Sequence, residues 1–319
     1  MCRRINLFYP CLLGGYYVFS IIVSIILSAI ETELPLWLSL VLSQGILLAI
    51  ALVYVLINKI NIVKCIPYRK LKIGDAIFSI LFGYAIVPLV LLISNITMLF
   101  STNHVAESSN ELTTYPFLLQ IFLMAVIPPL VEEFICRGLF YHSYRKNGIL
   151  GAAVASGLVF GILHLNINQF CYAFLMGIMF AFLVEATGSI WSSVLAHFSF
   201  NTYSIIMMKV SEVLTSGESV EDAAQTVETG GVEMFVVRIM AIIMLAFMAA
   251  IFTALAFIIF MTMAKRNGRW EYIKQNFKWG MKPRNGEKFF DLSFILTSVI
   301  AGLYMISTEI MIYLSSLIS

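Results

Sequence analysis

Charge is scarce in this sequence. Only 12% of the 319 residues are Asp, Glu, Lys or Arg, whereas 60% are hydrophobic, and the mean hydropathy is +0.92. Soluble domains usually carry about 25% charged residues, so this composition excludes an ordinary soluble domain. It predicts an all-α, polytopic transmembrane helical bundle, which we place in a bacterial plasma membrane.

Other features are missing as well. The apolar run after Arg3 and Arg4 is long enough to span and lacks a small-residue cleavage site, so we expect no cleavable signal peptide. There is no internal repeat, low-complexity tract or separate soluble domain, which predicts a single membrane domain over residues 1–319. The five cysteines lie in apolar runs or basic loops, and we expect no disulfide framework among Cys2, Cys11, Cys65, Cys136 and Cys171.

Long apolar runs set the expected topology. A span needs roughly 20 apolar residues at 1.5 Å rise each. This template predicts nine helices, at about 12–30, 35–57, 76–100, 116–143, 148–165, 167–185, 188–208, 233–263 and 290–318. The fifth and sixth are short and closely joined, so one of them could be a tilted or incomplete span, and eight spans are the alternative.

The loop charges support this count. Alternate connections, beginning with the N-terminus, hold 17 of the 20 Lys and Arg residues, and the intervening connections are acidic with Lys209 as their only basic residue. Basic residues mark the cytoplasmic side. The pattern predicts a cytoplasmic N-terminus, an outer C-terminus and a flexible acidic loop over 210–232 on the outside.

The basic loop 264–289 carries interleaved aromatic residues, which could indicate a nucleic-acid patch. Trp270, Tyr272, Phe277 and Trp279 alternate with lysines and arginines next to a predicted span. That combination fits a segment at the membrane surface better. We therefore expect the lipid bilayer, and no nucleic acid, as a partner of this loop.

Ionisable residues within the predicted spans are the candidates for function, because a charge near the bilayer centre costs roughly 2.5–3.5 kcal/mol on insertion scales. They are Glu132, Glu133, Arg137, His164, Glu185, His197, Arg238 and Glu309. Glu185 and Arg238 lie near predicted helix ends, where we expect interfacial positions, and Glu309 lies among polar neighbours that could hydrogen-bond it. The other five carry the functional argument.

Helical periodicity assigns different environments to the two adjacent glutamates. Glu133 and Arg137 are four residues apart, so they share one helical face and can form an ion pair. Glu132 points about 100° away and is free of that pair. Pro128 and Pro129 remove backbone donors just before it, so we expect a kinked or loosened helix that helps to open a polar cavity.

Two further pairs with the same spacing lie on later predicted helices: Phe160 with His164, and His197 with Asn201. A carboxylate and a histidine can orient and deprotonate a water, and a second histidine and an amide can stabilise an oxyanion. These groups suit amide hydrolysis without a protein nucleophile. Zinc is the competing use of Glu132, His164 and His197, but the HExxH spacing is absent.

Together these residues resemble the motifs of the CAAX prenyl protease and bacteriocin-processing (CPBP, Abi) intramembrane proteases. The family motifs EExxxR, FxxxH and HxxxN stand here as residues 132–137, 160–164 and 197–201, in the same order and spacing. The resemblance covers roughly Ile121 to Ile206 and places a protease core at about 116–208. Cys136 departs from the aromatic residue that the family often has.

The resemblance implies a glutamate-dependent intramembrane endopeptidase that acts on a membrane-associated or lipid-linked peptide or protein. On this interpretation Glu132 and His164 activate the water, while His197 and Asn201 stabilise the oxyanion. Glu133, Arg137 and Phe160 support them. The family is often labelled metalloprotease; we favour a metal-free mechanism, with Zn²⁺ as the alternative cofactor.

Two functions of other classes remain open at this point. A proton-coupled transporter would also need buried ionisable residues, although the sequence shows no matching pair of broken helices. A non-catalytic membrane scaffold or chaperone would keep the fold without the chemistry. The substrate is not readable: prenylated proteins, peptide leaders and signalling membrane proteins are all compatible.

Overall fold

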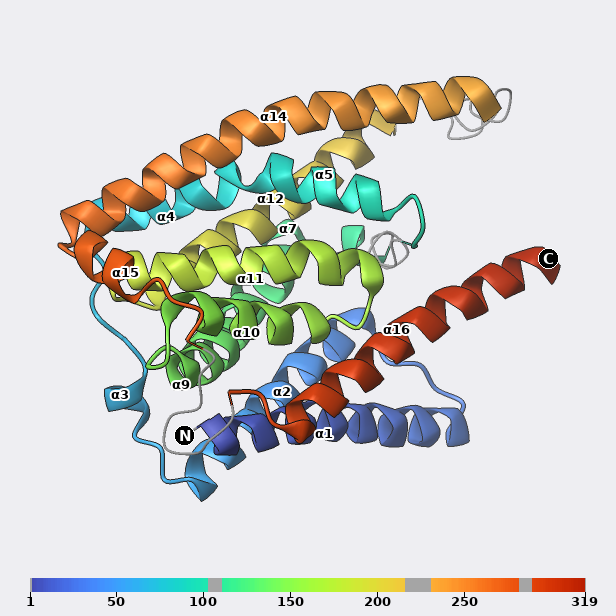
Figure 1. The fold of residues 1–319 in the computed structure, drawn as a ribbon. Coiled ribbons are helices and arrows are strands. Elements are labelled where there is room, and N and C mark those ends of the chain that lie inside the picture. Colours follow the sequence, from blue (N-terminus) through green and yellow to red (C-terminus); the bar gives the residue numbers. More distant parts are fainter. Residues whose placement is uncertain (1, 103–110, 216–230, 281–288, 319) are drawn as a thin grey trace.

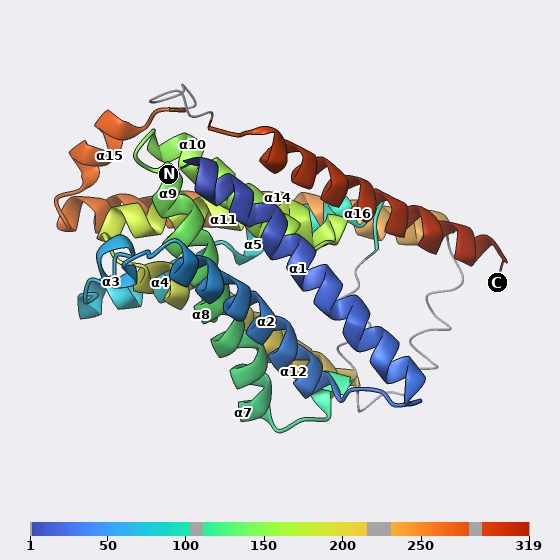
Figure 2. The same ribbon diagram turned by 90° about the horizontal axis from the view of Figure 1, so that it is seen from below.

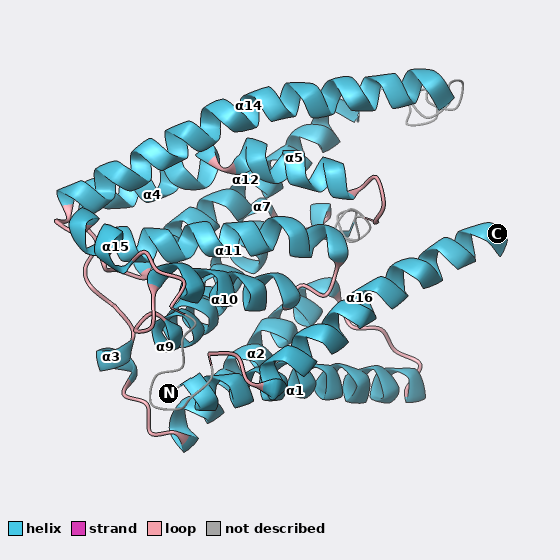
Figure 3. Ribbon diagram, viewed as in Figure 1, coloured by secondary structure: helices cyan, strands magenta, loops and turns pink. Residues whose placement is uncertain are grey.

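The computed structural model describes residues 2–102, 111–215, 231–280 and 289–318, and its regular structure within these ranges is helical (Figure 3). The elements are α1 (Cys2–Ala29), α2 (Leu36–Ile57), α3 (Ile62–Cys65), α4 (Ile73–Ala85), α5 (Val87–Thr97), α7 (Phe117–Gln120), η1 (Ile121–Val126), α8 (Ile127–Glu133), η2 (Phe134–Tyr141), α9 (His142–Tyr144), α10 (Ile149–Ile162), α11 (Ile167–Thr187), α12 (Trp191–Thr215), α14 (Gly231–Arg266), α15 (Trp270–Asn276) and α16 (Leu292–Ile318). One helix or a run of consecutive helices occupies each of the nine predicted segments. The all-α class is therefore confirmed for the described residues.

Seven helices or helix runs in the described part of the chain are long and apolar enough to cross a membrane, which makes this a multi-pass integral membrane protein. Two of the nine predicted spans are not among them. The helix α10 has 14 residues, or about 21 Å, which is shorter than the roughly 30 Å hydrocarbon core. The helix α12 has 25 residues but is less apolar. The count of nine spans stays a prediction.

The helices form a layered bundle (Figure 1). The long helix α14 lies along one side over α4 and α5, α10 and α11 lie in the centre, and α1, α2 and α16 form the opposite side. The N-terminus, α3, α9 and α15 gather at one end, and the C-terminus lies at the other. This grouping of the basic connections agrees with the alternation in the sequence, while the cytoplasmic placement of that end stays a prediction.

The first turns of α1 are helical and buried, although we expected the first helix to begin near residue 12. Ile5, Phe8 and Tyr9 are almost completely inaccessible. The Phe8 ring stacks on Tyr54 at 4.1 Å and on Phe140 at 5.5 Å. These contacts attach α1 to α2 and η2 on the side that Figure 2 shows from below. Tertiary packing thus extends the helix beyond the span that hydropathy predicts.

Glycines allow two close helix contacts beside the motif residues. A Cβ on Gly177 of α11 would lie 2.6 Å from the Cα of Gly157 in α10. A Cβ on Gly83 of α4 would lie 2.3 Å from the carbonyl oxygen of Ala196 in α12. Small residues at such contacts let helix backbones approach closely in a membrane. The first contact brings α11 next to Arg137, and the second supports the turn of α12 that carries His197.

Glu185 is buried within the protein, while its expected interfacial depth in the membrane stays a prediction. Its carboxylate accepts hydrogen bonds from Arg145 Nε at 2.6 Å, Arg269 Nη2 at 2.7 Å and the Tyr141 hydroxyl at 2.9 Å. Tyr141 and Arg145 belong to one segment and Arg269 to the turn before α15, so sequence alone does not bring the two segments together. A buried carboxylate needs such partners to offset its desolvation, so Glu185 ties the segment after α14 to the centre of the bundle.

Some expectations fall outside the described residues. These are most of the acidic loop 210–232, part of the basic loop 264–289 and the side chain of Arg238. The described part of the basic loop forms the short helix α15. Cys11, Cys136 and Cys171 are free thiols, as we expected for these three cysteines. The Glu309 carboxylate accepts hydrogen bonds from the backbone N–H and hydroxyl of Thr102 at 3.0 and 3.1 Å, which agrees with its expected hydrogen bonding.

Candidate active site

The segment that carries the two glutamates is an irregular helix. The α-helical stretch Ile127–Glu133 lies between two π-helical stretches, Ile121–Val126 and Phe134–Tyr141. Pro128 and Pro129 lie in its first turn and cannot donate backbone hydrogen bonds. The helix therefore departs from regular α-helical hydrogen bonding near the prolines, as their positions in the sequence predicted. Stretches of π-helix are rare and are frequent at functional sites.

The prolines also explain the position of Asn201. In an α-helix the carbonyl of Met124 would accept from residue 128, and in a π-helix from residue 129. Both residues are prolines, so neither can donate to Met124. The Asn201 side-chain amide on α12 donates to this carbonyl instead, at 2.8 Å. A carbonyl released by the sequence of one helix thus anchors the last motif residue on another.

Glu133 and Arg137 form the predicted ion pair. Arg137 Nη1 lies 2.8 Å from Glu133 Oε1, and both side chains are fully buried. Arg137 Nη2 also donates to the Gly177 carbonyl at 3.0 Å, and its guanidinium lies 4.5 Å from the centre of the Phe160 ring. These hydrogen-bonding and aromatic partners offset part of the cost of burying the two charges. The supporting role of Phe160 stays a prediction.

His197 lies between the two glutamates. Its Nδ1 is 3.1 Å from Glu133 Oε1, and its Nε2 is 3.9 Å from Glu132 Oε2. The rings of Phe160 and Phe180 each lie 5.5 Å away, and the side chain is almost fully buried. Because a carboxylate can only accept, Nδ1 donates to Glu133 and directs Nε2 towards Glu132.

Glu132 is free of the Arg137 pair, as helical geometry predicted, but it has another partner. Its Oε1 accepts a hydrogen bond from Gln44 Nε2 of α2 at 3.0 Å, and 13% of the side chain is exposed. Our reading of the sequence did not single out Gln44, because it lies 88 residues away and belongs to no motif. The sequence feature that could have identified Gln44 is a single amide side chain within an apolar span.

His164 contacts Phe160 as well. Its Nδ1 lies 2.8 Å from the Phe160 carbonyl, and its ring meets the Phe160 ring edge-on at 5.1 Å. A ring nitrogen beside a carbonyl donates to it, which leaves the lone pair of a neutral imidazole on Nε2. The described contacts join His164 to Phe160 and not directly to Glu132, and the Phe160 ring contacts both motif histidines.

The fit of a metal ion to these residues is poor. Within the described part of the chain, no three His, Cys, Asp or Glu side chains are grouped closely enough to hold a metal ion. Glu132 and His197 are each engaged with another side chain. The alternative set of Glu132, His164 and His197 is thus not assembled as a ligand cluster, and we derive no chemical step through zinc.

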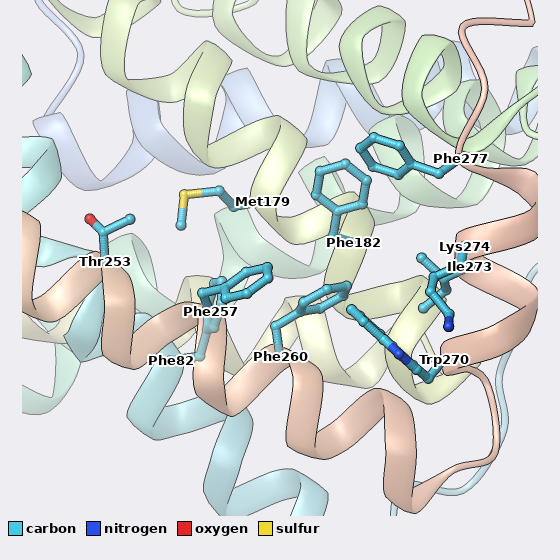
Figure 4. A pocket seen from close by; sticks show the side chains of 10 residues that line it. All are labelled: Phe82, Met179, Phe182, Thr253, Phe257, Phe260, Trp270, Ile273, Lys274 and Phe277. Carbon is cyan, nitrogen blue, oxygen red and sulfur yellow. The ribbon is translucent and has the colours of Figure 1, made fainter.

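Two hollows lie elsewhere in the bundle. A cleft of about 640 Å³ between α1 and α2 is lined in part by serines, including Ser20, Ser24 and Ser43. An apolar groove of about 510 Å³ lies between α11, α14 and α15 (Figure 4). The candidate catalytic side chains line neither of them.

Comparison with known proteins identifies the segment that carries the motifs. Residues 114–203 match the family model described as type II CAAX prenyl endopeptidase Rce1-like. The Bacillus subtilis (strain 168) protein named Putative membrane peptidase YdiL is 33% identical over 90 residues, which are 28% of this chain and 37% of that protein. No solved structure matches. The resemblance predicted from the three motifs is confirmed, and all three lie within the matched segment.

Proposed function

Because residues 114–203 carry the sequence of the type II CAAX prenyl endopeptidase Rce1-like family, we propose that this protein is an intramembrane endopeptidase. It hydrolyses peptide bonds of membrane-associated or lipid-linked peptides or proteins, and its protease core is about 116–208. The main support is the continuous chain of polar contacts from Arg137 through Glu133 and His197 to Glu132. Such a chain holds an ionisable group in one orientation within an apolar environment.

In the proposed reaction Glu132 is the general base. It takes a proton from a water molecule as the water oxygen forms a bond to the carbonyl carbon of the substrate peptide. The resulting tetrahedral intermediate collapses, the carbon–nitrogen bond breaks, and the protonated Glu132 gives its proton to the departing amine nitrogen. The products are a carboxylic acid, which keeps the second proton of the water until it ionises in solvent, and an amine, and Glu132 returns to its starting state. Its partial exposure supports this role, since a base must reach the water.

The oxyanion that forms on the substrate carbonyl needs hydrogen-bond donors. An asparagine amide has two N–H groups, and the bond to the Met124 carbonyl uses one of them, so Asn201 keeps the second. A protonated His197 donates from both ring nitrogens, one of which is held by Glu133. In our proposal these two side chains stabilise the oxyanion, and the loss of one such donor typically lowers the rate about 10²–10³-fold.

His164 is the second group that we assign to water activation. Its Nδ1 is engaged with the Phe160 carbonyl, so its Nε2 can accept a hydrogen bond from the water. His164 contacts the Phe160 carbonyl, whereas His197 contacts Glu133, so the two imidazoles have different partners. This arrangement supports separate roles for the two histidines.

Replacement of Glu132 or His164 by Ala tests the proposal. Membranes that carry each variant are compared with wild-type membranes by peptidomics and with a fluorogenic peptide that ends in a prenylated CAAX sequence. Glu309→Ala is the matched control, since this membrane glutamate lies outside the matched segment. We expect loss of cleavage in the first two variants and retention in the control, with and without a chelator. Full cleavage by Glu132→Ala would overturn the proposal, and flux that depends on a pH gradient without cleavage would favour a transporter.

A further inference from the structure

Gln44 has a polar side chain without an assigned role in the proposed reaction. It lies within α2, one of the most apolar spans, outside the segment that matches the protease family. Its Nε2 donates to Glu132 Oε1 at 3.0 Å. Its own Oε1 is buried and has no hydrogen-bond partner among the described residues. Buried amide oxygens are almost always hydrogen-bonded, so this atom needs an explanation.

The contact with Gln44 places the two carboxylate oxygens of Glu132 in different surroundings. Oε1 faces the Gln44 amide, and Oε2 faces His197 Nε2 at 3.9 Å. The Gln44 hydrogen bond restrains the rotation of the carboxylate, and an acid–base group is most effective when it is held in its productive orientation. The unpartnered Gln44 oxygen beside it is an acceptor that suits a donor from outside the protein, such as water or a substrate amide.

We propose that Gln44 is a positioning residue that holds the Glu132 carboxylate in its reactive orientation. This inference rests on the proposed function, because it assigns Gln44 to the reaction of Glu132. It also extends the site from the family segment to α2. A hydrogen bond to a charged group contributes enough to change a rate constant by about 10- to 100-fold.

Gln44→Leu and Gln44→Asn test the assignment with a peptide that the wild-type protein cleaves. Leucine removes the amide at similar size, and asparagine keeps it but withdraws it by one methylene. Gln120→Leu is the matched control, since Gln120 also donates through Nε2 and has an unpartnered Oε1, but its acceptor is the Tyr115 carbonyl. We expect kcat to fall about 10- to 100-fold in both Gln44 variants with little change in KM, and to be unchanged in the control.

A double-mutant cycle separates positioning from a purely structural role. Glu132→Asp withdraws the carboxylate from Gln44, so Gln44→Leu should cost little further activity in that background. Equal losses in both backgrounds, or an unchanged kcat in Gln44→Leu, would overturn the inference. If Gln44→Leu does not accumulate in membranes, Gln44→Asn decides the result by the same criteria. An active Glu132→Ala variant would instead reject the proposed function itself.

The apolar groove beside α15 carries an independent inference. Aromatic rings of Phe257, Phe260 and Trp270 surround it in Figure 4, and Phe182 and Met179 of α11 form the opposite wall. Its volume of about 510 Å³ is within the range of ligand pockets, roughly 300–1,000 Å³. The lining is almost entirely hydrocarbon, so its occupant must be apolar over most of its length.

One edge of this groove is cationic. The ammonium groups of Lys265 and Lys274 lie 6.0 and 5.9 Å from the centre of the Trp270 ring. Arg266 is the last residue of the candidate span in α14, so Lys265 lies at the end of that span and Lys274 follows it in α15. Lys274 is paired with Glu271, but both are exposed and such pairs are weak. Lysines beside a tryptophan at this depth are typical of contacts with lipid headgroups.

We infer that the groove binds one acyl chain of an anionic phospholipid whose phosphate contacts Lys265 and Lys274. The apolar wall fits the chain, and the two ammonium groups fit the negative headgroup. A zwitterionic lipid offers the same chain with less favourable charge. The inference does not depend on the proposed protease activity.

Native mass spectrometry of the purified protein with phosphatidylglycerol or phosphatidylcholine tests this site. We expect the wild-type protein to bind phosphatidylglycerol more tightly than phosphatidylcholine. In the Lys265→Gln/Lys274→Gln variant, the affinity for phosphatidylglycerol should fall by about 10-fold or more, because each basic residue near an anionic headgroup contributes a factor of about ten or less. Lys70→Gln/Lys72→Gln is the charge-matched control. Equal affinities for the two lipids would overturn the inference, and so would an equal loss of affinity in the control variant. Displacement of the bound lipid by a prenylated peptide alone would overturn it as well.

Discussion

His197 Nδ1 lies 3.1 Å from Glu133 Oε1, so the glutamate that pairs with Arg137 also orients the motif histidine. A histidine whose Nδ1 donates to a carboxylate has a fixed tautomer and ring orientation. Glu133 therefore has two partners, one cation and one imidazole, in a fully buried position. The supporting ion pair and the candidate catalytic residues form one network rather than two neighbouring features.

Disruption of this network should lower stability strongly. In Glu133→Gln the buried Arg137 loses its counter-charge, and removal of one member of a buried ion pair typically costs about 3–5 kcal/mol. The double variant Glu133→Gln/Arg137→Met should recover part of that loss but little cleavage, because a neutral amide oxygen holds the His197 Nδ1–H less strongly than a carboxylate does. Thermal unfolding in detergent and cleavage assays measure the two effects. A Glu133→Gln protein with wild-type stability would contradict the expectation.

Asn201→Ala should lower kcat about 10²–10³-fold if its free N–H stabilises the oxyanion. The same change leaves the Met124 carbonyl without its donor, so a modest loss of stability should accompany it. Thr202→Ala is the control, because its hydroxyl contacts only a carbonyl of its own helix. Steady-state kinetics on a cleaved peptide provide the measurement, and similar kcat values for both variants would argue against the assigned role.

Gly83→Ala should disturb the contact between α4 and α12. The new Cβ would lie 2.3 Å from the Ala196 carbonyl oxygen, so the backbone beside His197 must move. Gly14→Ala places a Cβ in open space and should be neutral or slightly stabilising, since alanine favours a helix. We expect reduced thermal stability and reduced cleavage for Gly83→Ala alone. Equal behaviour of the two variants would show that this close approach is not required.

The loop before α7 should respond to acid. The pKa of Glu111 is lowered mainly because its carboxylate accepts from the Leu36 backbone N–H, and secondly from the Tyr115 hydroxyl. Because this pKa is lower in the folded state, the contact stabilises the fold at pH values above the unfolded-state pKa of about 4.3. The stabilisation is lost as the pH falls through the folded-state pKa.

Fluorescence of a variant with Trp37 as its single tryptophan checks this expectation, because the Trp37 backbone N–H contacts the Tyr115 hydroxyl. The signal should change on acidification from about pH 6 to about pH 3, and Glu111→Gln should remove the change. An identical acid response in Glu111→Gln would assign it to another group.

Local helical spacing predicted part of the candidate site well. Residues four apart on a helix are neighbours, so the contact of Glu133 with Arg137 and that of Phe160 with His164 followed from their positions in the sequence. The separation of Glu132 from that ion pair followed from the same geometry. The free carbonyl of Met124 could also have been inferred from Pro128 and Pro129, because proline has no N–H to donate.

The contacts between helices could not be inferred in this way. Sequence indicated that both motif histidines would approach Glu132, but the structure places His197 against both glutamates and His164 against Phe160. Glu185 is buried between Arg145 and Arg269, which lie 40 and 84 residues away from it in the sequence. Each of these outcomes depends on how helices rotate and approach one another, which hydropathy and motif spacing do not encode.

The sequence by itself determined that this is a helical membrane protein with a protease motif set, because apolar run length and fixed spacing are local properties of a chain. Tertiary structure alone decided which groups Glu132 meets. Gln44 reaches it from a helix 88 residues away, and His197 reaches it through the anchor that Glu133 provides. Side-chain hydrogen bonds act over about 3 Å, so only the packing of α2, α8 and α12 could bring these groups together.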